Sequence, residues 1–445
     1  MRLVAILIVV AGCSMQGQGK DKCTVQADCL DGFVCNAGTC EQPGPGPGCT
    51  PATCQPNQCN AIDDGCGGTL QCGGCSGGDV CSASHVCGPP PMYCTNGVID
   101  PYDGESDVDC GGSCGGCDTG KMCRTTDDCA TGTCESGTCV AGRWATVMPM
   151  PTPRTMLAAV EGPDGLIYAI GGDTENSGPT NVVEAYDPVN DSWSTRAPMP
   201  TPRYGLSAVV GSDGKIYAIG GEYNSQTFTD GNSVKVEVYD PVANTWAAAP
   251  SLPDGRYMGA AVADTNGKIY ETGGITVNPD MLLGSVVSLT PGGNSWTAVS
   301  DPMTTPRDGH AAATTSDGTI YVVGGLDGND TETTTFESYA PGTPGWHTLA
   351  ALPTPRKMTS AATLADKIYV VGGNSWLSRS VTYSTVVEVY DAAAHAWSRV
   401  ASLPVGRFDH ATVATSSGKL YVFGGESDGD STNTTAVTFV YTPDP

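Results

Sequence analysis

Cysteine is missing from the last 306 residues of this 445-residue chain, because all 21 cysteines lie between Cys13 and Cys139. The absence excludes disulfides, thiolate metal sites and a cysteine nucleophile from that part of the chain. Long hydrophobic runs are also scarce. The one pronounced run, residues 3–10, is too short to span a bilayer. Apolar stripes with the helical period are absent, which argues against a helix-rich fold.

Positive charge is the second scarcity. Lys and Arg number 21 against 47 Asp and Glu, so the formal net charge is −26. Such a surface repels nucleic-acid phosphates and anionic lipid headgroups. Nucleic acid is therefore excluded as a partner, and any membrane association is expected to depend on an anchor.

The N-terminus has the pattern of an export signal. A basic Arg2, an apolar run and small residues precede Cys13. The sequence VAGC that ends at Cys13 resembles the bacterial lipobox, in which the cysteine is acylated and becomes the mature N-terminus. Removing Cys13 also leaves 20 cysteines, which can pair completely. We expect a signal peptide over residues 1–12 and a lipidated tether over 13–22. The resemblance implies a protein anchored to the outer membrane or cell surface. The alternative is an ordinary cleaved signal.

Residues 23–140 are predicted to form a disulfide-rich stalk. Dense, short-spaced cysteines with few aliphatic residues between them are typical of a segment that cannot bury a core. Zinc is the rival interpretation for the pairs Cys72/Cys75 and Cys114/Cys117, but the other gaps are irregular. The segment resembles cysteine-rich modules of bacterial surface proteins, which implies a spacer or a small adhesive module.

Residues 141–445 are a repeat array. The pattern of a strand ending in two glycines, as in GKIYAIGG at residues 214–221, occurs six times at a period near 50 residues. A phosphate loop occurs once per site, so these glycines are architectural. Each unit opens with an arginine and most end with a tryptophan. The repeat arginines are Arg154, Arg203, Arg256, Arg307, Arg356 and Arg407. The repeat tryptophans are Trp144, Trp193, Trp246, Trp296, Trp346 and Trp397.

Each unit predicts four short strands with turn signals about every ten residues, which describes one antiparallel sheet. The second strand is apolar on both faces, so both faces must be covered, and a ring of stacked sheets covers them. The double glycine, the downstream tyrosine and the tryptophan resemble kelch repeats. The resemblance implies an all-β fold, a six-bladed kelch-type β-propeller. The sixth unit lacks its own tryptophan, and Trp144 is expected to supply the outer strand of blade six.

Catalytic motifs such as H-E-x-x-H and G-x-S-x-G are absent from the sequence. The copper chemistry of proteins resembling galactose oxidase needs a cysteine in the propeller and is excluded. His310 and His410, three residues after a repeat arginine, are expected to line the pore or to be hydrogen-bonded. The arginines either bind anions as a ring or tether their own blades. No catalytic residue, cofactor or metal is predicted, since DGND at Asp327 lacks the ligand spacing of a calcium loop.

Function is expected on the face that carries the variable loops between the second and third strands. Candidate ligand-binding residues in these loops are Tyr223, Asp327, Asp330, Trp376, Arg379, Glu426 and Asp428. Trp376 lies outside the repeat register, and an exposed aromatic beside arginine suits a sugar or a peptide. The sequence favours a monomer that binds a protein or glycan without catalysis. The alternative is a carbohydrate-active enzyme that resembles the sialic-acid mutarotases.

Overall fold

The computed structural model describes residues 117–174, 177–223, 234–276, 281–377, 380–427 and 434–444, and six short strands before residue 117. The chain divides into two compact units. The first consists of Met1–Cys117 and Lys121–Ala130, and the second of Asp118–Gly120 and Thr131–Pro445. In the described part of the chain, no helix is long and apolar enough to cross a membrane.

The described residues of the first unit form three short hairpins and one 3-10 turn. β1 (Val34–Asn36) pairs with β2 (Thr39–Glu41), β3 (Ala61–Asp63) with β4 (Thr69–Gln71), and β5 (Val80–Cys81) with β6 (Cys87–Gly88). The 3-10 helix η4 spans Thr126–Asp128. Five cysteines between residues 117 and 139 are disulfide-bonded, namely Cys117, Cys123 and Cys129 in this unit and Cys134 and Cys139 in the second. A disulfide-rich, loop-rich stalk is therefore confirmed for the described part of this segment.

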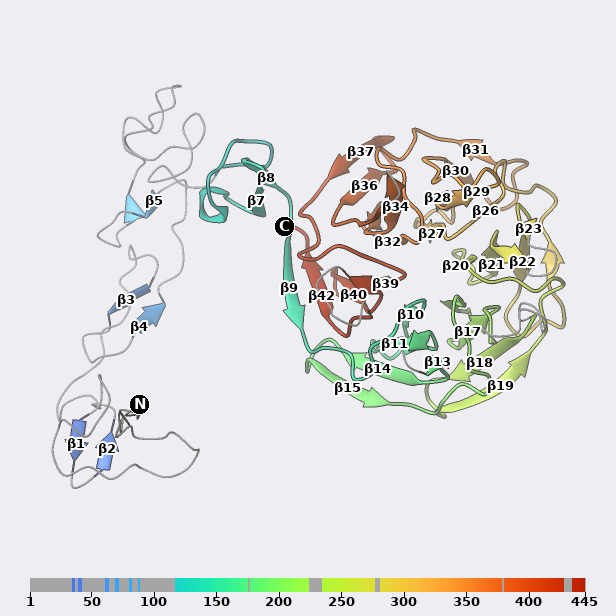
Figure 1. Cartoon of the computed structure of the whole chain (residues 1–445), viewed down its shortest axis with the longest axis horizontal. Coiled ribbons are helices and arrows are strands. Elements are labelled where there is room, and N and C mark those ends of the chain that lie inside the picture. Colours follow the sequence, from blue (N-terminus) through green and yellow to red (C-terminus); the bar gives the residue numbers. More distant parts are fainter. Residues whose placement is uncertain are drawn as a thin grey trace, which may run out of the picture. The chain divides into compact units, whose positions relative to one another are not determined.

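The second unit begins with the hairpin of β7 (Thr133–Glu135) and β8 (Thr138–Val140) and continues into six four-stranded antiparallel sheets (Figure 1). Blade 1 contains β10 (Ala158–Glu161), β11 (Ile167–Ile170), β14 (Val183–Asp187) and β15 (Ser192–Thr195). Blade 2 contains β16 (Ser207–Val210), β17 (Ile216–Ile219), β18 (Val236–Asp240) and β19 (Thr245–Ala249). Blade 3 contains β20 (Ala260–Ala263), β21 (Ile269–Thr272), β24 (Val286–Leu289) and β25 (Thr297–Ala298).

Blade 4 contains β27 (Ala311–Thr314), β28 (Ile320–Val323), β30 (Phe336–Tyr339) and β31 (His347–Thr348). Blade 5 contains β32 (Ser360–Leu364), β33 (Lys367–Val371), β36 (Val387–Asp391) and β37 (Ala396–Arg399). Blade 6 contains β39 (Ala411–Ala414), β40 (Leu420–Phe423), β42 (Thr438–Thr442) and β9 (Arg143–Val147). The predicted six-bladed all-β propeller is therefore confirmed.

Blade 6 joins the two ends of the propeller, because β9 precedes blade 1 in the chain and pairs with β42, the last strand (Figure 1). In this pairing Trp144 lies opposite Tyr441. The Trp144 indole donates a hydrogen bond to the Ala401 carbonyl of blade 5's outer edge at 2.7 Å. The ring is thus closed by backbone pairing rather than by side chains alone.

Each repeat tryptophan links its blade to the one before. The indole N–H of Trp193, for example, donates to the Met148 carbonyl at 3.0 Å, and that of Trp246 donates to the Ala197 carbonyl at 2.9 Å. The second strand of each blade has four consecutive buried residues, which are all apolar in five blades, as at β17, and include Glu271 and Thr272 in blade 3. The β-branched and aromatic residues in these strands suit a pleated surface that is covered on both sides.

The double glycine ends the second strand against the next blade. Gly220 and Gly221 have φ values of 62° and 89°, and a Cβ at Gly220 would lie 2.5 Å from the Arg256 carbonyl oxygen. Gly221 N–H donates to that same carbonyl at 2.9 Å. A larger residue would separate the two blades here, so glycine is required by the close approach.

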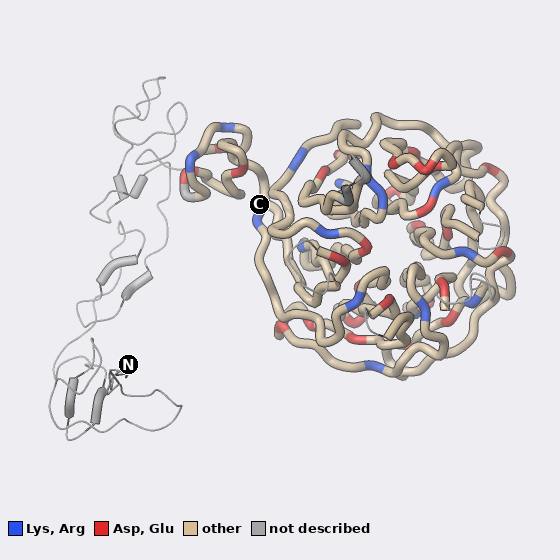
Figure 2. Tube along the Cα trace, viewed as in Figure 1, with Lys and Arg blue, Asp and Glu red and all other residues tan. Residues whose placement is uncertain are grey.

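The loops that follow the double glycine add five small two-stranded sheets. These are β12 (Asp173–Thr174) with β13 (Gly178–Pro179), β22 (Ile275–Thr276) with β23 (Met281–Leu282), β26 (Arg307–Asp308) with β29 (Leu326–Asp327), β34 (Asn374–Leu377) with β35 (Ser380–Tyr383), and β38 (Arg407–Phe408) with β41 (Glu426–Ser427). Figure 2 shows that basic and acidic positions recur around the ring.

Candidate functional site

The candidate site is the mouth of the central channel on the face that carries the variable loops. The connections between blades and the loops after the double glycine share this face, because short bridges join them. Tyr204 bridges to Glu222, for example, and Lys357 bridges to Asn374. Residues that follow each repeat arginine are thereby gathered around the propeller axis.

A ring of six residues surrounds the mouth. Each member lies two positions after a repeat arginine, and its backbone N–H donates to the carbonyl of the previous member at 2.8 to 3.1 Å. The members are Met156, Gly205, Met258, Gly309, Met358 and Asp409. Met156 donates to Asp409 and completes the circle. All six have φ between 50° and 61°, a conformation that costs energy for the four that are not glycine. We call this circle the axial ring.

The axial ring encloses a cavity of about 110 Å³, lined in part by Leu157, Leu206 and Thr359. Methionine alternates with a smaller residue around the ring, and at Gly309 the alternation has a steric reason. A Cβ at Gly309 would lie 2.7 Å from the Met358 sulfur, so the methionine side chain occupies the space above the glycine. The mouth therefore presents flexible thioether side chains on a fixed backbone circle. Below it, the first strands of all six blades line a channel cavity of about 150 Å³.

Two histidines lie beneath the axial ring. His310 and His410 are both buried. Their Nε2 atoms are paired with the Thr272 hydroxyl at 3.0 Å and the Ser360 hydroxyl at 2.8 Å. Burial and the adjacent repeat arginine lower the pKa of each to about 3, so both are neutral at physiological pH. Their Nδ1 atoms have no hydrogen-bond partner among the described residues.

Carboxylates gather on one side of the mouth. Burial, together with the charges of Glu426 and Asp308, raises the pKa of Asp409 to about 8, and the Lys357 ammonium opposes this shift. Burial likewise raises the pKa of Asp308 to about 6, with Lys357 opposing and Asp330 adding to the shift. At neutral pH, Asp409 is mostly protonated while Asp308 is mostly ionised. Of these two carboxyl groups, Asp409 lines the cavity itself. Carboxyl groups with raised pKa values often mark functional sites.

The opposite side of the mouth is aromatic. The Tyr204 hydroxyl donates to Glu222 Oε2 at 2.7 Å, and the Tyr204 and Tyr257 rings meet edge to face with centroids 6.4 Å apart. Burial is the largest cause of the raised pKa of Tyr204, and the hydrogen bond to Glu222 is the next largest. This phenol therefore remains a neutral hydrogen-bond donor at every physiological pH.

The six repeat arginines lie within the blades and do not form a free anion-binding ring. Each is at most 1% exposed. Each guanidinium donates to the carbonyl of its blade's first paired glycine and to the carbonyl before the third strand, as Arg307 does to Gly324 at 3.1 Å and Thr335 at 2.9 Å. Burial lowers the pKa of Arg154 to about 10, and Glu184 opposes that shift. The arginines therefore stabilise the ends of the second and third strands, from which the loops around the mouth begin.

The predicted ligand-binding residues occupy several different environments. Tyr223 is 39% exposed, and the Lys235 ammonium lies 5.9 Å from its ring centroid. Asp327 shapes its own loop, since its Oδ1 accepts from the Asn329 N–H at 2.9 Å. Glu426 and Asp330 act electrostatically on the mouth carboxyl groups, as described above.

Three of the predictions fall outside the described residues. Arg379 and Asp428 lie there, as does the side chain of Trp376, whose backbone is part of β34. Cys13 and the tether lie there too. Sequence reasoning missed the axial ring, Asp308 and the protonated Asp409. The available signal was the position two residues after each arginine, where methionine, glycine and aspartate alternate.

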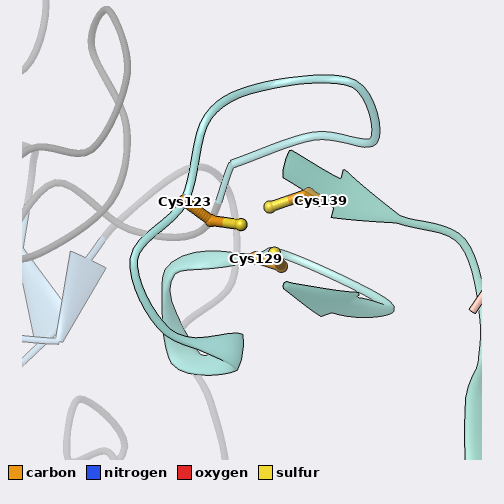
Figure 3. Close-up of side chains that lie close together, drawn as sticks. All are labelled: Cys123, Cys129 and Cys139. Carbon is orange, nitrogen blue, oxygen red and sulfur yellow. The ribbon is translucent and has the colours of Figure 1, made fainter. Parts of the chain in front are cut away.

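The described cysteines do not offer a thiolate site. Figure 3 shows the side chains of Cys123, Cys129 and Cys139, each of which is disulfide-bonded. A metal requires the thiolate form of cysteine, which an oxidised pair does not provide. In the propeller, the described His, Asp and Glu side chains form no group of three close enough to hold one ion.

Comparison with known proteins places this geometry among the propellers. A family model described as the Attractin/LZTR1 beta-propeller matches residues 167–436. Kelch-like protein 36 of Mus musculus is 30% identical over 180 residues, which are 39% of this chain and 28% of that protein. Kelch-like protein terF of Aspergillus terreus is 29% identical over 285 residues, 59% of this chain and 60% of that protein. The chain thus spans 28 to 60% of the length of these relatives.

A solved structure titled "Structure of YjhT" superposes with a TM-score of 0.55. It is 18% identical and covers 66% of this chain and 95% of its own. At that identity the likeness is one of fold.

Proposed function

Because the chain belongs to the Attractin/LZTR1 β-propeller family, we propose that its kelch-type propeller is a non-catalytic binding module. It holds a partner protein or glycan at the loop face, over the mouth of the channel. The kelch-like relatives favour a protein. The observation that carries the proposal is the axial ring, a rigid backbone circle that presents three flexible methionines at one mouth. Thioether side chains repack easily against different apolar surfaces.

The size of the cavity favours a protein segment over a buried small molecule. Pockets for small molecules usually measure roughly 300–1,000 Å³. The mouth cavity is about 110 Å³, which suits a single inserted side chain. The remaining contact area would come from the loops, in which Tyr223, Asp327, Asp330, Trp376, Arg379, Glu426 and Asp428 are the proposed ligand-binding residues.

We also propose a location for this module. The lipobox-like end at Cys13 supports acylation at that residue, and the cysteine-rich segment supports a spacer between anchor and propeller. The propeller would then be displayed at the outer membrane or cell surface as a monomer. Mass spectrometry of the mature N-terminus tests the acyl group.

A second candidate is a carbohydrate-active enzyme of the mutarotase kind. It is favoured by the raised pKa values of Asp308 and Asp409, because general acid–base catalysis uses carboxyl groups that titrate near neutral pH. Exchange of free sugar anomers, followed by NMR, separates the two functions. Acceleration by the wild type that Asp409→Asn abolishes would establish catalysis.

The binding function is tested by site-directed photo-crosslinking on the full-length protein. One variant carries the crosslinker in place of Tyr223 on the loop face. The control carries it in place of Val242, which is 95% exposed and lies in a turn between the third and fourth strands, at the other end of its blade. We expect a partner to be captured at Tyr223 and not at Val242.

Affinity for the captured partner then tests the loop residues. Trp376→Ala should weaken binding by roughly 1–3 kcal/mol while the fold is kept. Trp246→Ala should instead unfold the blade, because that indole joins two blades. Capture only at Val242, or unchanged affinity in Trp376→Ala, contradicts the proposed loop-face site.

A further inference from the structure

Three carboxyl groups and one ammonium group meet beside the mouth. Asp409 is an axial-ring residue and lines the cavity. Glu426 comes from β41, Asp308 from β26, and Lys357 from the connection into blade 5, and each acts electrostatically on Asp409. His410 beside it is neutral, and Arg407 is engaged with backbone carbonyls. The acidic groups therefore outnumber the basic group that faces them.

One oxygen of these carboxylates is buried without a hydrogen-bond partner. Asp308 is only 5% exposed, and its Oδ1 has no hydrogen-bond partner among the described residues. An unpartnered buried oxygen of this kind is costly, and native proteins usually satisfy it with a donor or an ion. Asp308 also acts electrostatically on Asp409, which lines the cavity, so a cation that enters beside Asp409 is attracted by both carboxylates.

We propose that the mouth accepts the cationic tip of one basic side chain, lysine or arginine, from the partner protein. The inference deepens the proposed function and rests on it. The charged tip pairs with Asp409 and Asp308, while the aliphatic stem lies against the methionines of the axial ring. Long basic side chains commonly bury their methylene stems on apolar surface in this way. Charge complementarity with the acidic chain favours the same choice of partner.

The size and lining of the cavity fit such a side chain. Its volume of about 110 Å³ and its lining by Met156, Met258 and Met358 allow one slender chain to enter. A carboxylate-bearing side chain would meet the same cavity but would be repelled by Glu426 and Asp308. An apolar side chain would fill the space and leave the Asp308 oxygen unpaired.

Entry of a cation must be linked to release of a proton. Asp409 holds its proton at neutral pH because burial and neighbouring carboxylates oppose ionisation. A cation binds the ionised form, so affinity should rise as the pH rises through the pKa of Asp409 and level off above it. Below that pKa, the rise is roughly tenfold per pH unit when one proton is displaced. The lysine ammonium, with a pKa of about 10.4, stays charged over this range.

Methionine methyl NMR on the full-length protein tests the proposal. The chain contains 12 methionines, and single Met→Leu variants assign the three mouth methyls. Two cationic probes, N-acetyl-lysine methylamide and N-acetyl-arginine methylamide, are titrated at pH 6.5 and pH 8.5. N-acetyl-norleucine methylamide is the uncharged control. We expect the cationic probes to shift the mouth methyls with an affinity at least tenfold higher at pH 8.5. The two arms show which basic side chain is preferred.

The variants distinguish the carboxyl cluster from general acidity. Asp409→Asn should abolish both the methyl shifts and their pH dependence. Asp254→Asn is the matched control, since Asp254 is an exposed residue of the connection into blade 3, and should change nothing. Preserved methyl positions elsewhere show that each variant is folded.

Four results would overturn the inference. Three of them are mouth methyls that do not shift with the cationic probes, equal shifts with norleucine, and unchanged binding in Asp409→Asn. The fourth is a response to the probes that is seen only in Lys357→Met, because it would show that Lys357 already occupies the cation position. The proposed function is tested separately. If a partner is captured at Tyr223 and its affinity is the same for Asp409→Asn as for the wild type, loop-face binding is supported and a basic side chain in the mouth is not.

Discussion

Blades 1, 2, 4 and 5 each bury an ion pair between the repeat arginine and a glutamate on the third strand, whereas blades 3 and 6 do not. The pairs are Arg154–Glu184, Arg203–Glu237, Arg307–Glu337 and Arg356–Glu388. In blade 3 the glutamate position is Val287, and in blade 6 it is Phe439. The arginine itself is kept in all six blades.

The two exceptional blades satisfy their arginines differently. Arg256 donates to the Ser285 hydroxyl at 3.2 Å, and a displaced carboxylate, Glu271 on β21, attracts it electrostatically. Arg407 lies over the Phe439 ring, 4.5 Å from its centroid, where a cation–π contact replaces the ion pair. The constant partners are the two backbone carbonyls. The comparison teaches that the arginine is present to hold the blade edge, and that the carboxylate is optional.

The largest effect is expected from removing one partner of a buried pair. Arg307→Leu leaves the buried Glu337 without its counter-ion, although Thr304 still donates hydrogen bonds to it. Arg407→Leu removes the same kind of carbonyl bonds but leaves no carboxylate without a counter-ion. Arg307→Leu should lower the free energy of unfolding by roughly 3–5 kcal/mol more than Arg407→Leu. Denaturant unfolding of the two variants measures the difference. Equal losses would show that the ion pair contributes nothing beyond the carbonyl bonds.

A smaller, pH-dependent effect is expected in blade 3. Burial raises the pKa of Glu271 from 4.5 to about 7, with Arg256 and Ser207 opposing the shift. The native state therefore binds a proton that the unfolded state releases, and stability falls as pH rises from about 4.5 to about 7. Glu271→Gln should match the wild type at pH 4.5 and exceed its unfolding free energy by on the order of 3 kcal/mol at pH 8.5. A parallel pH dependence in both proteins would contradict this assignment.

The smallest effect is expected from an exposed ion pair. Lys215 and Asp240 are 3.4 Å apart in blade 2, with the lysine side chain 42% exposed. Lys215→Met should change the unfolding free energy by no more than about 0.5 kcal/mol, and less at high salt. Thermal unfolding at two salt concentrations provides the check. A loss comparable to that in Arg307→Leu would mean that burial does not separate the two classes of pair.

The fold could be predicted because its determinants repeat. The double glycine, the tyrosine and the tryptophan recur at fixed spacing, and each has a local steric or hydrogen-bonding reason that holds in every blade. Trp144 was recognisable as the closing residue because the sixth unit lacks a tryptophan, and the antiparallel pairing of β9 with β42 follows from it.

The mouth could not be predicted in the same way. Met156, Gly309 and Asp409 differ in chemistry, and only closure of the ring makes them neighbours. The raised pKa of Asp409 depends on Glu426, Lys357 and Asp308, which come from three different segments. The raised pKa of Glu271 could not be predicted either, since the environment of this side chain arises between two blades. These clusters form from residues that are distant in the sequence and close in the fold, so no local sequence pattern indicates them.

The axial ring couples its sequence to the number of blades. Its members alternate between methionine and a smaller residue, and a circle can alternate all the way round only when it has an even number of members. Duplicating a single blade would therefore set two methionines, or two smaller residues, side by side. The consequence differs from place to place, because a Cβ at Gly309 would lie 2.7 Å from the Met358 sulfur, whereas a Cβ at Gly205 would meet its nearest neighbour, Tyr257, at 3.3 Å. A methionine added in place of Gly309 would thus meet a closer contact than one added in place of Gly205.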